Sequence, residues 1–69
     1  MYVIIELQTA ADGTVGTIVQ TAPNLNAADQ IYHTMLSYAA VSEVYCHSVC
    51  MISADGTPIK HEGYWHKGD

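Results

Sequence analysis

The chain has no arginine and no phenylalanine, and its only basic residues are Lys60 and Lys67. Seven acidic residues outnumber these two, which gives a formal net charge of −5 at pH 7. A nucleic-acid-binding surface needs clustered basic side chains that displace counterions from phosphates. The composition therefore argues against a nucleic-acid partner.

Long apolar runs are also missing. No segment approaches the ~20 consecutive apolar residues of a membrane-spanning helix. No basic segment precedes a short apolar one, as it would in a secretory signal. We expect a cytoplasmic protein without membrane contact. The 69 residues are 49% hydrophobic, which predicts one small globular domain over residues 1–69.

Cysteine is scarce, with only Cys46 and Cys50 in the chain. Two cysteines are too few for the disulfide framework of a small secreted protein. Both fall in a segment that reads as a strand, where four steps separate them by roughly 13 Å. A disulfide needs Cα atoms within ~7 Å, so the pair cannot be bridged. We expect two half-buried free thiols.

Two segments near the N-terminus have the composition of a β-hairpin. Residues 2–9 and 14–22 are rich in β-branched side chains and alternate in part between apolar and polar types. A three-residue loop ending at Gly13 places Ile5 opposite Val19 and keeps apolar side chains together. A two-residue loop would slip the pairing by one position. We prefer the three-residue loop.

The next segment predicts the only helix. Pro23 ends the preceding strand, Asn26 is a suitable N-cap, and the Asp29 carboxylate would meet the amides of the first turn. Residues 27–41 contain no glycine or proline, and their apolar side chains share one helical face. This predicted core face consists of Ala28, Ile31, Tyr32, Met35, Leu36, Tyr38 and Ala39.

A second hairpin is predicted from residues 44–53 and 57–66, joined by a repeat of the Ala-Asp-Gly-Thr turn. A three-residue loop places Val49 opposite His61 and sorts polar from apolar side chains better. A two-residue loop instead places Cys50 opposite His61. Both registers remain open, with the first preferred.

The order of elements is β-β-α-β-β. If the helix crosses back over the sheet, the third strand runs antiparallel beside the first. This predicts an α+β fold, a four-stranded antiparallel sheet in the order 2-1-3-4 with one helix on one face.

One helix leaves the other face of the sheet without cover. A large apolar patch on so small a domain is usually covered by another molecule. We therefore expect a homodimer or higher oligomer, formed through this face or through an edge strand. In the preferred register of the second hairpin, this face carries Tyr2, Ile4, Ile18, Cys46, Cys50, Ile52 and Tyr64. The predicted interface residues are Tyr2, Ile4, Ile18, Cys46, Ile52 and Tyr64.

The histidines are the only plausible reactive set, and no recognised metal-ligand spacing is present. In the preferred register His47 and His61 are diagonal neighbours that could share an ion, which gives two ligands. In the other register Cys50 faces His61 and forms the only conceivable nucleophile–base pair. We therefore expect no metal, no cofactor and no enzymatic activity.

Three segments carry a resemblance: YVIIELQT with ADGTVG, NAADQIYHTMLSYAAVS, and HSVCMISADG with IKHEGYWH. The whole chain resembles a group of short open reading frames of bacteriophages and integrated mobile elements of anaerobic gut bacteria. The most specific part of this resemblance is Tyr32-His33 in the predicted helix, followed by residues 39–42 and 47–49. The Cys46 and Cys50 pair lies outside that pattern. The resemblance implies a phage-related accessory or particle-assembly protein and carries over no catalytic residue.

The leading interpretation is a non-enzymatic interaction or assembly module that associates with itself and with a protein partner. The alternative is a small metal- or ligand-binding protein that uses His47, His61 and Cys50. The register of the second hairpin discriminates the two, because it decides whether these side chains converge.

Overall fold

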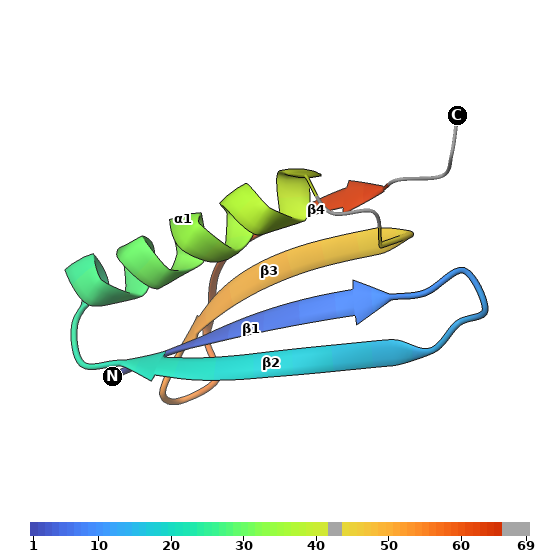
Figure 1. Cartoon of the computed structure of the whole chain (residues 1–69). Coiled ribbons are helices and arrows are strands. Elements are labelled where there is room, and N and C mark those ends of the chain that lie inside the picture. Colours follow the sequence, from blue (N-terminus) through green and yellow to red (C-terminus); the bar gives the residue numbers. More distant parts are fainter. Residues whose placement is uncertain (42–43, 66–69) are drawn as a thin grey trace.

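A computed structural model of the chain describes residues 1–41 and 44–65. One helix lies on one side of a four-stranded antiparallel sheet with the strand order β2-β1-β3-β4 (Figure 1). The predicted α+β fold and its β-β-α-β-β order are confirmed. The elements are β1 (Tyr2–Thr9), β2 (Val15–Ala22), α1 (Leu25–Val41), β3 (Cys46–Ser53) and β4 (Pro58–Trp65).

The helix begins earlier than the sequence predicted. Asn24, rather than Asn26, is the N-cap: its Oδ1 accepts a hydrogen bond of 2.9 Å from the amide of Ala27. Asp29 therefore lies beyond the first turn and instead binds Lys60. The carbonyl of Asn24 also accepts a 3.0 Å hydrogen bond from the amide of Ala28, as the N-cap carbonyl of a helix does.

The first hairpin has the predicted register, with Ile5 opposite Val19 and Leu7 opposite Thr17. Its three-residue loop is closed by a 2.8 Å hydrogen bond from the amide of Ala10 to the carbonyl of Thr14. Gly13 has a φ of 92°, a left-handed conformation that side chains with a Cβ rarely adopt. Glycine is therefore required at this turn.

The second hairpin combines the preferred loop with the other register. Ser53 and Thr57 close a three-residue loop, and Ile52 pairs with Pro58. The register then shifts between Ile52 and Met51, which pairs with Lys60. Ile59 lies between the two paired positions as the extra residue of a β-bulge. The preferred register is therefore wrong beyond the bulge, and Cys50 lies opposite His61.

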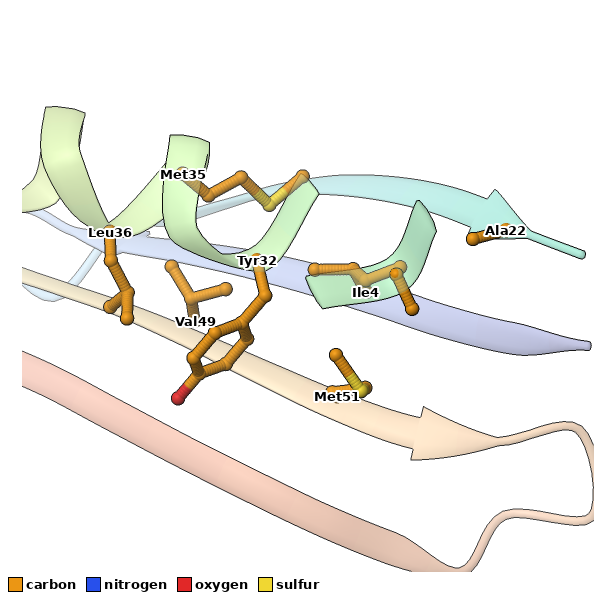
Figure 2. Packing of buried hydrophobic residues seen from close by; sticks show 8 residues of the cluster. Ile4, Ala22, Tyr32, Met35, Leu36, Val49 and Met51 are labelled. Carbon is orange, nitrogen blue, oxygen red and sulfur yellow. The ribbon is translucent and has the colours of Figure 1, made fainter. Parts of the chain in front are cut away.

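The core lies between α1 and one face of the sheet, where side chains from the helix and from β1 and β3 meet (Figure 2). Five helix residues are buried, all from the predicted core face, whereas Tyr38 is 65% exposed. The buried apolar cluster consists of Ile4, Ala22, Ala28, Tyr32, Met35, Leu36, Val49 and Met51.

A charged contact ties the helix to β4. Lys60 Nζ donates a hydrogen bond of 2.6 Å to Asp29 Oδ1 and lies 4.6 Å from the centre of the Tyr32 ring. Burial of Tyr32 raises the pKa of its hydroxyl above the ordinary value, and the Glu62 carboxylate adds to this effect. The β-bulge makes this contact possible, because it places Lys60 on the helix side of the sheet.

The N-cap gives the first prediction. Asn24→Ala should lower the free energy of unfolding by about 1 kcal/mol, because the Ala27 amide loses its partner. Asn26→Ala is the matched control and should change it by less than about 0.5 kcal/mol. Urea unfolding followed by circular dichroism measures both. A larger loss for Asn26→Ala would contradict the assignment of the cap.

The second turn gives a prediction about pH. The Ser53 hydroxyl donates to the Asp55 carboxylate, Thr57 adds further hydrogen bonds, and the pKa of Asp55 falls from 3.8 to about 2. A lowered carboxyl pKa contributes stability above pH 3.8, and this contribution is lost as the pH falls toward 2. Ser53→Ala should raise the Asp55 pKa toward 3.8 in an NMR titration.

Asp12, in the matching first turn, is the internal control for this titration. The Thr14 backbone amide is the main cause that lowers the pKa of Asp12. Ser53→Ala should leave that pKa in place. An Asp55 pKa that does not move in the variant would show that the Ser53 hydroxyl is not its principal partner.

Candidate functional site: an uncharged sheet face and a buried acid

The face of the sheet opposite α1, here called the open face, is built from alternate residues of all four strands. Strand pairing places Val3, Ile5 and Leu7 of β1 at its centre, with Val19 and Cys50 on either side of Ile5. In the strands that the structure describes, the open face consists of Val3, Ile5, Leu7, Thr9, Val15, Thr17, Val19, Thr21, Cys46, Ser48, Cys50, Ile52, Pro58, His61, Gly63 and Trp65.

None of these open-face residues is Asp, Glu or Lys. The charged residues of the described strands, Glu6, Lys60 and Glu62, all lie on the helix side. The solvated face of an antiparallel sheet usually carries the charged side chains, whereas here they lie on the covered face. The open face thus combines an aliphatic centre with threonine, serine and histidine side chains and carries no Asp, Glu or Lys.

The predicted interface is corrected by this geometry. Ile4 is fully buried under the helix, and Tyr2 and Tyr64 pack against the same core. Ile18 pairs with Glu6 and also lies on the helix side. These four residues were assigned to the wrong face. Cys46, Cys50 and Ile52 do lie on the open face.

The assignment was wrong because both faces of β1 carry apolar side chains. Val3, Ile5 and Leu7 form an unbroken aliphatic row, and placing Tyr2 and Ile4 on the uncovered face implies that this row faces the helix. The row that does face the helix contains Glu6, which is 6% exposed. A buried carboxylate is tolerated only when other groups bind it.

Two side chains bind Glu6. The Nε2 atoms of His47 and Gln8 each lie 2.7 Å from Glu6 Oε2, and both donate to it when the carboxylate is ionised. Strand pairing brings them together, because His47 lies opposite Gln8, which shares a face of β1 with Glu6. His47 is 3% exposed. No described residue binds its Nδ1 atom, which is buried.

The structure separates the predicted metal ligands. His47 lies on the helix side, whereas Cys50 and His61 lie opposite each other on the open face. The described residues contain no group of three or more His, Cys, Asp or Glu side chains that could hold a metal ion. Cys46 and Cys50 are free and half-buried. His47, His61 and Cys50 therefore do not converge on one site.

Aromatic residues flank the sheet at the end of β4. Trp65 is 63% exposed, and its ring meets the Tyr45 ring edge to face, with 5.8 Å between the ring centres. On α1, the exposed His33 makes a similar contact with the Tyr32 ring. His66 lies outside the described residues.

Comparisons of the chain with protein-family models, curated proteins and solved structures find no match. Within residues 1–41 and 44–65, no helix is long and apolar enough to cross a membrane.

The buried acid gives a prediction about stability. Glu6→Leu leaves the buried His47 ring without its partner, and His47→Leu leaves the carboxylate with Gln8 alone. Each single change should lower the free energy of unfolding by about 2–4 kcal/mol. The double variant Glu6→Leu/His47→Leu should lie within about 1 kcal/mol of the unmodified protein, because the buried carboxylate and the buried ring are both removed and only the half-buried Gln8 amide loses a partner.

Urea unfolding at one protein concentration measures this cycle, and the coupling is the difference between the double change and the summed single changes. Losses that simply add would show that the two side chains do not act as a pair.

Proposed function

We propose that this protein is a non-enzymatic assembly module that associates with a second copy of itself through the open face. The single observation that carries the proposal is the absence of charged side chains from that face, together with its aliphatic centre of Val3, Ile5, Leu7 and Val19. Burial of aliphatic surface is the main driving force for association.

The size of the face suits a weak dimer. Each strand has eight residues, which corresponds to a length of ~27 Å at ~3.4 Å per residue. Four strands at a spacing of ~4.8 Å give a width of ~19 Å, hence ~500 Å² per copy and ~1,000 Å² for a pair. An interface of this size is at the lower end of specific interfaces. A dissociation constant of about 1–100 μM is expected.

The charge distribution favours a second copy as the occupant. Two copies with a net charge of −5 repel each other wherever their acidic residues come close. The open face is the broad surface of the described sheet on which no acidic residue lies, so pairing there keeps the carboxylates apart. Two such faces would pack as sheet on sheet, with the strands of the two copies at about −30°.

Edge pairing is the competing mode of self-association. On β4, Pro58 lacks a backbone donor and the bulge at Ile59 interrupts the ladder, and both features protect an edge strand. β2 has neither feature. Pairing through β2 is therefore the alternative that the experiment has to separate from pairing through the open face.

The resemblance to short reading frames of phages and mobile elements supports placing such a module among phage-related accessory or assembly proteins. A protein partner in the native host belongs to the same proposal. Affinity capture from that host with a monomeric variant beside the unmodified protein would separate partners that need the assembled form from those that do not.

Charged substitutions on the open face test the proposal. Val19→Glu on β2 and Cys50→Asp on β3 should each raise the dissociation constant at least tenfold, because a carboxylate would be buried without a partner. Analytical ultracentrifugation from about 1 to 200 μM protein covers the range expected for such an interface. Val19→Lys should also raise the dissociation constant, although it changes the net charge in the opposite direction from Val19→Glu. This result would show that the effect comes from burying a charge and not from added negative charge.

Ser37→Glu is the matched control, since it adds the same charge on the exposed side of α1 and should leave association unchanged. Dimers that survive Cys50→Asp but not Val19→Glu would indicate pairing through the β2 edge. A monomer at every concentration would contradict the proposal.

A further inference from the structure

A cavity of about 390 Å³ lies between α1 and the β2 half of the sheet. It exists because the helix leaves β2 largely uncovered. Ala22 is the only buried residue of that strand, whereas Lys60 and Asp29 tie the helix to β4 at the other edge. The volume is within the range of small-molecule sites, which begins near 300 Å³.

The lining of the cavity is apolar with polar groups at defined places. Ile18 of β2 lines it together with Ile31 and Met35 of α1, and the amides of Gln20 and Gln30 add hydrogen-bonding groups from both elements. Met35 is 4% exposed and Ile18 is 46% exposed, so one side of the cavity is core and the other is open to solvent. This combination is typical of sites for small organic molecules.

The charged group of the cavity is the Glu6 carboxylate. Its Oε2 atom accepts hydrogen bonds from His47 and Gln8, and no described residue donates to its Oε1 atom. Oε1 differs from His47 Nδ1, which is sealed from solvent without a partner, and Glu6 is one of the residues that line the cavity. Two hydrogen bonds thus hold the carboxylate in place and leave one oxygen for a ligand.

These features define the class of ligand. A carboxylate that lines an apolar cavity attracts a cationic donor, and a charge-assisted hydrogen bond is the strongest polar contact it can make. The net charge of −5 favours cations and opposes anions at every approach. Among the described residues, His47 pairs with Oε2 and not with Oε1, and Lys60 is engaged by Asp29 at the other edge of the sheet.

We propose that this cavity binds a small organic amine, with the protonated amino group on Glu6 Oε1 and the apolar body between Ile18, Ile31 and Met35. The site lies on the opposite side of the sheet from the open face, so a dimer formed through that face leaves it accessible. The proposal is independent of self-association.

The probe is 2-phenylethylammonium, which joins a protonated amine to an apolar ring. We expect a saturable NMR titration of the ¹⁵N-labelled full chain at constant pH and salt, with shifts grouped on β1, β2 and α1 around the cavity. 2-Phenylethanol has the same body without the charge and should bind at least about tenfold more weakly. 3-Phenylpropanoate carries the opposite charge and should give no saturable binding.

Glu6→Gln tests the carboxylate and should weaken binding of 2-phenylethylammonium at least about tenfold. Ile18→Trp tests the cavity independently, because the larger ring fills the space at a half-exposed position while Glu6 stays in place. It should abolish binding without unfolding the chain. Glu62→Gln removes the same charge from the same side of the sheet on β4, away from the cavity, and should bind normally.

Equal affinity for the alcohol and the amine, or unchanged binding in Glu6→Gln, would overturn the proposal. Shifts that do not saturate, or that persist in Ile18→Trp, would also overturn it. Sedimentation of the same samples measures self-association separately, so failure of amine binding and failure of self-association can be told apart.

Discussion

One helix can cover only one face of a four-stranded sheet, and here it covers the face that carries Glu6. The rest of the molecule depends on this constraint. The covered face has to accommodate an acid, so His47 and Gln8 are brought to it by strand pairing. The uncovered face receives the aliphatic row Val3, Ile5 and Leu7, and so becomes the surface that another molecule can cover.

The elements and their order could be predicted from local signals. Proline and glycine positions, period-two alternation and the helical periodicity were sufficient for the sheet order, the first hairpin and most of the helix face. The face of β1 could not be predicted, because its apolar side chains occur on both faces. The deciding contact joins Glu6 to His47, which is 41 positions away in the chain, and a local pattern carries no information about such a partner.

The bulge at Ile59 is a second feature that local sequence patterns could not predict. The repeated Ala-Asp-Gly-Thr turn correctly predicted a three-residue loop, but the register changes one pair after the loop. The change places Lys60 against Tyr32 and Asp29 on the helix. This contact joins β4 to α1, and the sequence of the hairpin alone does not indicate it. The register of an edge strand is thus determined here by tertiary contacts, and a turn alone does not specify it.

β2 is the element in which the two proposed surfaces meet. Ile18 and Gln20 line the cavity, while Thr17 and Val19 lie on the open face, because successive side chains of a strand point to opposite sides. β2 pairs with β1 alone and has only Ala22 buried, so the core holds it at one end only. A ligand or a second copy that binds the native strand would stabilise it by mass action. Contacts on either side of β2 would therefore give this strand stability that its few core contacts do not provide.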